Sequence, residues 1–241
     1  MNVYECKTPH ELLAGNPYPG RGIVIGRTPT GRCAVAYFIM GRSRNSRNRV
    51  FELTGDTLYT KPFDRALVED PSLIIYAAVR RYENNLIVTN GDQTDTVYEG
   101  LMAGKSFSQA LAARTFEPDR PNFTPRISGM VTFSAGSFSY EMSILKSADP
   151  AGSACSRYTF SYPATVGVGH FIHTYMGDGE VLPTFCGEPE RMSICESLDE
   201  FTDSIWQNLN ESNRISLYTQ MIDPVSGESE YRLINKNGGA D

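Results

Sequence analysis

The order of secondary-structure patterns along this chain constrains its fold more than any other feature. Runs of β-branched and aromatic residues, separated by turn residues, predict strands at residues 22–27, 32–40, 50–53, 73–80, 85–89, 130–133, 138–145, 156–161, 170–175, 214–222 and 230–234. Helical patterns cover residues 94–103 and 106–114, and a capping box opens a third helix with the apolar stripe Leu198, Phe201, Ile205 and Leu209. No internal repeat divides the chain. This order predicts an α+β layered domain and not a regular βαβ winding.

The first 20 residues form a distinct segment of the sequence. Thr8–Gly15 predicts a short helix, with Thr8 as its N-cap, Pro9 at its first position and Glu11 as the capping-box partner. Prolines and a glycine in residues 16–20 then break the chain. We therefore expect an N-terminal extension at residues 1–20, packed on a single domain at residues 21–241.

Composition narrows the classes of function. A formal net charge of −6 argues against a general nucleic-acid-binding protein, and no apolar run is long enough to cross a bilayer. Residues 1–5 lack the pattern of a signal peptide, and the five cysteines contain no C-x-x-C pair, which suits reduced thiols. We expect a soluble, cytoplasmic protein that binds neither nucleic acid nor membrane, with Cys33 buried in an apolar strand.

Residues 87–96 predict a strand that enters an Asn-Gly turn and then a helix. Gly91 allows a positive φ, which most residues avoid, and short polar residues such as Asn90 and Thr94 favour caps and turns. Free backbone N–H groups at such a junction commonly bind a small anion. The alternative is a well-capped strand–turn–helix junction with no ligand.

An arginine cluster stands out in this acidic chain. Arg42, Arg44, Arg47 and Arg49 lie within eight residues. Forked guanidinium donors suit phosphate binding. The alternatives are a solvated basic loop or a nucleic-acid patch.

Two histidines raise the question of a metal. His170 and His173 lie on a predicted strand at a spacing that places them on opposite faces. No recognised zinc signature supplies a third ligand. We expect packed or surface histidines and no metal site.

Several motifs together resemble the archaeal-type IMP cyclohydrolase family. They occur in consistent order across roughly residues 21–127: Gly22–Arg27, Ala36–Tyr37, the loop Arg42–Arg49, Tyr76, Val88–Asp95 with its Asn-Gly-x-x-Thr-Asp element, and Thr124–Ile127. His173–Tyr175 is a weaker late match. The chain departs from the family in its N-terminal piece and in a longer arginine loop. It also has Phe123 at the position where the family has an asparagine, and its own asparagine, Asn122, lies one position earlier.

The resemblance implies both a fold and a reaction. The family has a four-layer αββα sandwich resembling N-terminal nucleophile hydrolases, without autoprocessing, and no Cys, Ser or Thr follows Met1 here. Its members close 5-formamidoimidazole-4-carboxamide ribonucleotide to IMP with loss of water in purine biosynthesis. That scheme implies a purine-nucleotide substrate and no cofactor.

The resemblance also assigns roles to residues of this chain. The substrate-binding set is Arg42, Arg49, Asn90, Gly91, Thr94, Asp95 and Arg126. The catalytic set is Tyr76, Asn122 as the replacement for the displaced family asparagine, and Glu117, an acidic residue that aligns with the family only across a gap. Arg42 and Arg49 are expected at the phosphate or ring oxygens, Asn90 at the carboxamide or formyl oxygen, and Asp95 at a ribose hydroxyl or an arginine. Tyr76 is expected to donate a proton to the oxyanion, and Glu117 to act as the acid/base.

Each of these roles has a structural alternative. Asn90 and Asp95 suit turn capping, Tyr76 suits core packing, and Arg126 suits a surface salt bridge. Asn122 suits backbone hydrogen bonding, and Glu117 suits an exposed loop carboxylate. At the level of function, the alternatives are a related amidohydrolase acting on a C–N bond and a non-catalytic purine-nucleotide-binding protein. Stacked sheets with exposed edges are also compatible with a homo-oligomer.

Overall fold

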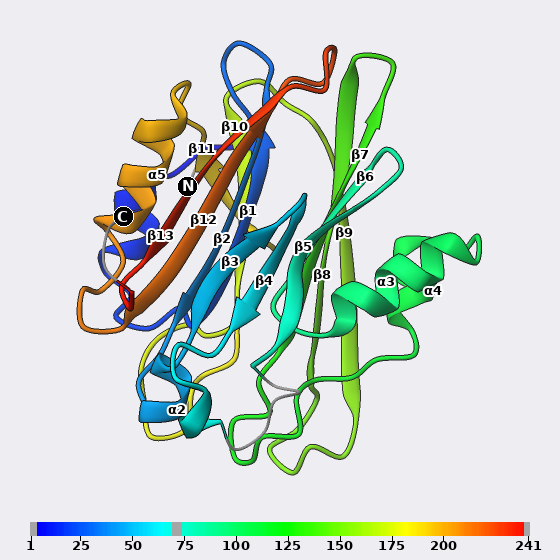
Figure 1. Ribbon diagram of the computed structural model, residues 1–241. Helices are drawn as coiled ribbons and strands as arrows, with labels where there is room; N and C mark the ends of the chain where they lie inside the picture. The colour runs from blue at the N-terminus through cyan, green and yellow to red at the C-terminus, as the bar shows by residue number, and fades with distance from the viewer. Residues whose placement is uncertain (1–3, 69–73, 239–241) are drawn as a thin grey trace.

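The computed structural model describes residues 4–68 and 74–238, which form two stacked antiparallel sheets (Figure 1). The six-stranded sheet has the order β11-β10-β1-β2-β12-β13, and the seven-stranded sheet follows chain order from β3 to β9. The strands of the first are β1 (Arg21–Arg27), β2 (Cys33–Met40), β10 (Val168–His173), β11 (Glu190–Ser193), β12 (Arg214–Ile222) and β13 (Ser229–Asn235). Those of the second are β3 (Val50–Thr54), β4 (Thr57–Lys61), β5 (Tyr76–Tyr82), β6 (Asn85–Thr89), β7 (Arg126–Ser134), β8 (Ser137–Ser147) and β9 (Cys155–Pro163).

Helices cover the outer faces of both sheets. Figure 1 shows α1 (Pro9–Leu13) and α5 (Leu198–Trp206) against the six-stranded sheet, and α3 (Gln93–Met102) and α4 (Phe107–Leu111) against the seven-stranded sheet. The predicted apolar stripe of α5 is buried against its sheet, as amphipathic periodicity requires. The predicted α+β class is therefore confirmed. None of the helices in the described ranges is long and apolar enough to cross a membrane.

The main core lies between the two sheets, and β1 and β2 are buried on both of their faces. Ile23 and Ile25 of β1 belong to the core between the sheets, whereas Val24 packs with the helices on the outer side. The sheets approach closely at Gly129 of β7, where an added Cβ would lie 2.5 Å from Ile25 Cδ1. A larger side chain there would separate the sheets.

Most predicted elements are present, with shifted ends. Thr8 caps α1 with Glu11 in a capping box, and Cys33 is buried in β2, as expected. The sequence patterns missed β4, β11, the short α2 (Arg44–Arg47) and the 3₁₀ turn at Arg65–Leu67. These elements are only three to five residues long, too short for a clear period. The predicted strand start at residue 73 lies outside the described residues, and β5 begins at Tyr76.

Gly91 does not use the positive φ that a glycine allows, because it is not among the glycines with positive φ. A close contact explains the glycine instead: an added Cβ would lie 2.6 Å from Arg126 Nη1 and 2.7 Å from Gln93 Oε1. The residue leaves room for two side chains to meet.

His170 is buried between the sheets, far along the chain from the arginine cluster. Its Nδ1 lies 2.7 Å from the Tyr140 hydroxyl, and its ring stacks on that of Tyr162 with centroids 3.6 Å apart. Burial lowers the pKa of His170 from 6.5 to about 4. The neutral ring is therefore the form that the folded protein accommodates.

This burial predicts an acid-sensitive stability. Between pH 6.5 and about 4 the unfolded chain binds a proton at His170 that the folded chain excludes, so stability present above pH 6.5 is lost as the pH falls. We expect the free energy of unfolding to drop by about 2 kcal/mol over this window, less than the unscreened shift implies. Urea unfolding of the native chain and of His170→Phe measures the slope. A His10→Gln control should retain it, and an equal slope in His170→Phe would contradict the assignment.

Candidate active site

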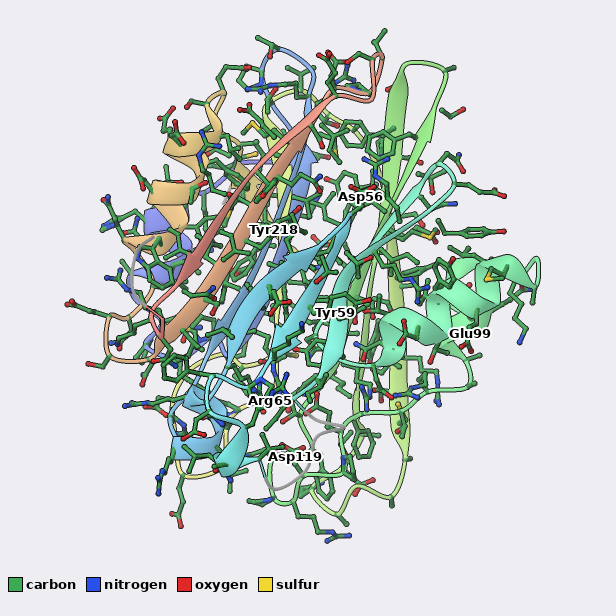
Figure 2. All side chains as sticks on the ribbon, in the orientation of Figure 1. Asp56, Tyr59, Arg65, Glu99, Asp119 and Tyr218 are labelled. Atoms are coloured by element: carbon green, nitrogen blue, oxygen red, sulfur yellow. The ribbon has the colours of Figure 1, made fainter. Side chains whose placement is uncertain are left out.

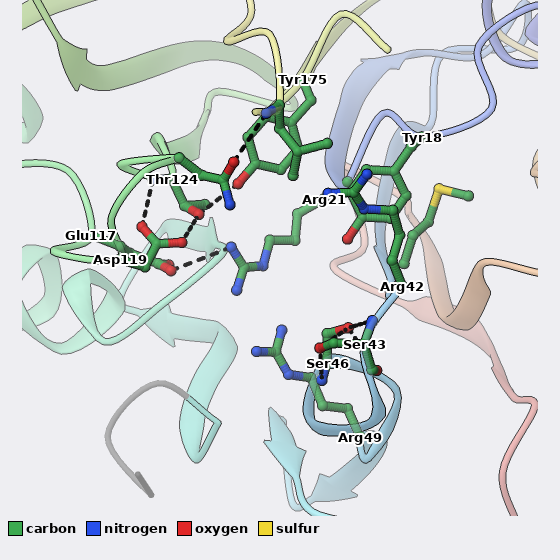
Figure 3. A pocket seen from close by; sticks show the side chains of 14 residues that line it. Tyr18, Arg21, Arg42, Ser43, Ser46, Arg49, Glu117, Asp119, Thr124 and Tyr175 are labelled. Atoms are coloured by element: carbon green, nitrogen blue, oxygen red, sulfur yellow. Dashed lines mark hydrogen bonds and ion pairs between the residues drawn. The ribbon is translucent and has the colours of Figure 1, made fainter. Parts of the chain in front are cut away.

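A cavity of about 270 Å³ opens at one end of the sandwich, close to the size of small-molecule sites. Its walls come from the start of β1, the loop after β2 with α2, the Pro-rich crossing before β7, and the loop after β10. Asp119 marks this end in Figure 2, and Figure 3 shows the guanidinium groups of Arg21 and Arg49 pointing into the same space. The cavity has a cationic side and an acidic side.

Three arginines form the cationic side. Arg21 and Arg49 are 9% and 7% exposed, whereas Arg42 is half-buried. Burial, and secondarily the charge of Arg21, lower the pKa of Arg49. Two buried guanidinium groups facing one space repel each other, and a bound anion would relieve that repulsion. The cavity is therefore built for a ligand that carries negative charge.

The arginine loop owes its shape to the short helix α2. Ser43 caps this helix and forms a capping box with Ser46, and both residues line the cavity. The helix separates the cluster: Arg42 and Arg49 lie at the cavity, whereas Arg44 and Arg47 are exposed. Arg42 is held by an ion pair with Asp178.

A buried carboxyl group dominates the acidic side. Glu117 is 4% exposed, and its Oε2 lies 3.4 Å from Arg21 Nη1. Burial raises the pKa of Glu117, while the positive charge of Arg21 opposes the shift. A buried carboxyl group with a raised pKa beside a cation suits proton transfer.

A hydrogen-bonded chain continues from Asp119. The Asp119 carboxylate accepts from the backbone N of Thr124 at 2.7 Å and from its hydroxyl group. The Thr124 hydroxyl also lies 2.5 Å from the Tyr175 hydroxyl. Burial raises the pKa of Tyr175, so the phenol stays protonated. This series of hydrogen bonds fixes the side chains of Asp119, Thr124 and Tyr175 in the cavity wall (Figure 3).

Asn122 and Phe123 have different surroundings. Asn122 lines the cavity, and its Oδ1 accepts from the backbone N of Leu182 at 3.0 Å. Phe123 has a positive φ of 44°, and its ring packs 5.4 Å from that of Phe116. A Cβ on Gly152 would lie 2.6 Å from the Phe123 ring, so a glycine admits the phenyl group. The shifted asparagine thus faces the cavity, and the phenylalanine packs behind it.

Tyr76 lies next to the cavity without lining it. Its hydroxyl group is 2.8 Å from that of Tyr37, which joins β5 of one sheet to β2 of the other. Both rings are buried, and burial raises the pKa of Tyr37. Both phenols are close enough to act electrostatically on Arg21 and Arg49.

The Asn-Gly turn holds the segment that enters β7. Asn90 Nδ2 donates to Pro125 O at 2.9 Å, and Asn90 Oδ1 accepts from the backbone N of Ile127 at 2.9 Å. Arg126 donates to Asp92 Oδ1 and Gln93 Oε1, each at 2.7 Å. Asn90 is fully buried, so its polar atoms serve the protein's own backbone in this structure.

The remaining predicted binding residues also lie away from the cavity. The Thr94 hydroxyl is 2.7 Å from that of Thr89, and Asp95 pairs with Arg80 at 2.7 Å. Arg126 is near enough to Glu117 to act on its charge. The structure therefore brings Arg42, Arg49, Glu117 and Asn122 together at the cavity, with Tyr76 and Arg126 adjacent to it.

The two predicted histidines contact protein groups. His173 Nδ1 lies 2.8 Å from Tyr175 O, and its Nε2 lies 3.3 Å from Glu190 Oε2. His170 contacts Tyr140 on the opposite side of β10. Within the described ranges, no group of three or more His, Cys, Asp or Glu side chains is placed to hold a metal ion.

Comparison with known sequences places this cavity in a family. The family described as IMP cyclohydrolase-like protein matches residues 18–228. The chain belongs to this family. The resemblance inferred from the motifs is thereby confirmed, and the family match includes every residue of the cavity wall.

Individual relatives cover less of the chain. The IMP cyclohydrolase of Methanococcus aeolicus is 33% identical over 114 residues, 46% of this chain and 56% of that protein. The IMP cyclohydrolase of Methanocella arvoryzae is 34% identical over 119 residues, 48% of this chain and 58% of that protein. The IMP cyclohydrolase of Methanopyrus kandleri is 30% identical over 115 residues, which are 46% of this chain and 57% of that protein. The aligned part of the chain thus spans little more than half the length of these curated relatives.

Sequence patterns in this IMP cyclohydrolase-like chain missed several cavity residues. Arg21 directly precedes the family-like run Gly22–Arg27, and a charged residue at the start of a strand that is otherwise apolar was the available signal. Tyr18 lies in the segment assigned to the N-terminal extension, yet it lines the cavity. The Arg42 Cζ atom lies over its ring, 5.0 Å from the ring centroid. Thr124 and Tyr175 lie in segments that resemble the family, but their contact joins residues 51 apart and no sequence pattern predicted it. Asp119 was not predicted, although it binds Thr124 within the same loop.

Replacing Asn90 by alanine is expected to weaken the fold. The variant leaves Pro125 O and Ile127 N without their buried partner, which should lower the free energy of unfolding by about 2–4 kcal/mol. Denaturant unfolding measures this loss. The control Asn84→Ala removes an exposed side-chain bond to Phe133 O and should cost less than about 1 kcal/mol. Equal losses of unfolding free energy in the two variants would show that the buried hydrogen bonds of Asn90 stabilise the fold no more than an exposed one does.

Proposed function

We propose that this chain is an IMP cyclohydrolase that closes 5-formamidoimidazole-4-carboxamide ribonucleotide to IMP with release of water. One observation carries the proposal: in a chain of this family, a single cavity has buried arginines on one side and the buried Glu117 on the other. Such a cavity suits a substrate with an anionic phosphate at one end and a reacting polar ring at the other.

The proposed pose follows the charge distribution. The phosphate lies on the cationic side, between Arg42, Arg49 and the hydroxyl groups of α2. The imidazole ring and its two substituents lie toward Glu117 and Thr124. Both reacting groups belong to one molecule, so the cavity contributes by fixing their rotamers.

The proposed chemistry is a ring closure followed by dehydration. The carboxamide nitrogen attacks the formyl carbon, a C–N bond forms, and the formyl oxygen gains negative charge. Arg21 stabilises this charge while Glu117 accepts a proton from the nitrogen and returns it to the oxygen. The hydroxyl group then leaves as water with the proton of the formamido nitrogen, and the C=N bond forms between that nitrogen and the former formyl carbon, while the carboxamide nitrogen keeps its remaining hydrogen.

Other residues have supporting roles in this proposal. Tyr76, paired with Tyr37, donates a hydrogen bond toward the oxyanion from beside Arg21. Asn122 orients the formyl or carboxamide oxygen from the cavity wall. Asn90 positions the Thr124–Ile127 segment, and Arg126 places a charge near Glu117. Gly91 leaves room for Arg126, Thr94 holds the turn through Gly91 O, and Asp95 holds Arg80. No step of this scheme calls for a cofactor.

The layer order also supports the fold expected for the family. Helices, two sheets and helices are stacked in that order, and we propose that the chain shares the fold of N-terminal nucleophile hydrolases without their nucleophile. Residues 1–20 are proposed to be an extension that contributes Tyr18 to the cavity. The proposed setting is the cytoplasm, where purine nucleotides are made.

Incubation of the purified chain with the formamido-imidazole ribonucleotide tests the proposal. We expect a rise in the absorbance of IMP, with turnover that persists in the presence of a chelator. Tight binding of IMP by folded protein without turnover would favour a non-catalytic purine-nucleotide-binding protein. Hydrolysis of linear amides without ring closure would favour an amidohydrolase.

A further inference from the structure

A second hollow adjoins the cavity and shares Arg42 with it. It has a volume of about 420 Å³ and takes Arg44 and Arg47 into its wall. These are the two arginines of the sequence cluster that the cavity itself does not use. The two hollows therefore meet at Arg42, and all four arginines of the sequence cluster line one or the other.

The walls of this second hollow are fixed by hydrogen bonds. Asn48 and the backbone of Asp64 exchange two bonds of 2.7 Å, which holds the exposed Phe63 in place. Asn237 Nδ2 donates to Arg47 O at 2.6 Å, and Arg47 Nε donates to Gly41 O at 3.1 Å. Such bonds reduce the ordering cost of binding a ligand.

The charge of the second hollow is unbalanced. Within the described part of the chain, no carboxylate lines it, and no hydrogen bond or ion pair engages the side chain of Arg44. Arg42 alone has an acidic partner, Asp178. Three guanidinium groups around one hollow contrast with a chain of net charge −6. The hollow is thus suited to a compact polyanion, and the acidic surface elsewhere disfavours a nucleic-acid strand.

We propose that the second hollow binds the outer phosphates of a purine nucleoside triphosphate whose first phosphate lies in the cavity at Arg42 and Arg49. This inference rests on the proposed function. The triphosphate occupies the substrate's own place, so it acts as a competitive inhibitor. Arg42 lies at the junction of the two hollows, where the first and second phosphates meet.

Calorimetric titration with IMP, IDP and ITP tests this directly, since the three ligands differ only in phosphate number. Without divalent cations and at low salt, we expect ITP to bind about tenfold more tightly than IMP, as two partly exposed charge-assisted contacts would give. The double variant R44Q/R47Q should bind both ligands equally and leave the affinity for IMP unchanged. The control Arg232→Gln removes an exposed arginine on β13 and should retain the preference.

Failures of the two proposals are distinguishable. Equal affinity of the native chain for IMP and ITP would overturn the polyphosphate site and leave the cyclohydrolase proposal intact. No binding of any inosine nucleotide, with Arg44-dependent binding of inorganic tripolyphosphate, would contradict the nucleotide cavity and support the second hollow. Should the double variant fail to fold, Arg44→Gln alone replaces it, because its exposed side chain holds no described contact; we expect it to reduce the ITP preference about threefold.

Discussion

Replacing Glu117 by glutamine is expected to lower kcat for ring closure by about 10²–10⁴-fold, the range for loss of a general acid–base group. Glutamine keeps the shape of the side chain and an oxygen that accepts from Arg21, but it cannot move a proton. KM should change far less than kcat, because the proposed pose puts the phosphate on the other side of the cavity. Steady-state kinetics of the native and variant chains measures the split.

The pH profile adds a second readout for Glu117. Burial raises its pKa, so kcat/KM of the native chain should rise as the pH increases through that raised value and the carboxylate becomes the base. Glu117→Gln should lose this limb of the profile. Removing the charge also leaves Arg21 buried without its partner, so thermal unfolding must confirm that the variant is folded. An exposed control, Glu228→Gln, should change neither quantity, and a folded Glu117→Gln with native kcat would exclude the acid–base role.

Replacing Arg49 by alanine is expected to raise KM by about 10–100-fold, the cost of one charge-assisted contact to phosphate. Arg49 is buried at the cavity, and its pKa is lowered by burial and by Arg21, so a bound phosphate restores a favourable field around it. Arg42→Ala should have a smaller effect, because Arg42 is half-buried and already paired with Asp178.

Two comparisons make the Arg49 result specific. Arg49→Lys keeps the charge but loses the fork, so it should recover part of the affinity. A substrate analogue without its phosphate should bind the native chain and Arg49→Ala alike. An unchanged KM in both Arg49→Ala and Arg42→Ala would contradict the proposal that the phosphate binds on this side of the cavity.

The layered fold was predictable because periodicity is a local property. Alternating and apolar runs such as residues 22–27 and 214–222 predicted the strands, and the stripe of α5 predicted a covering helix. Short elements escaped for the same reason: β11 and α2 have four residues each, less than the length over which a period is visible. Their positions are set by pairing and capping partners distant in sequence.

The site was predictable only where residues of one chemical type lie close together in the sequence. Four arginines in eight residues pointed to anion binding, but only tertiary structure separates Arg42 and Arg49 from the outward Arg44 and Arg47. Arg21 and Glu117 are 96 residues apart, and no pattern in the sequence announces their contact. Asn90 shows the converse: its motif is conspicuous in sequence, yet its polar atoms hold backbone in the structure.

A crystal structure of the chain with IMP bound tests the central claim most directly. We expect the phosphate at hydrogen-bonding distance, about 2.7–3.2 Å, from Arg49, with the purine ring toward Glu117 and Thr124. IMP bound outside this cavity, or bound with its base at the arginines and its phosphate toward Glu117, would contradict it.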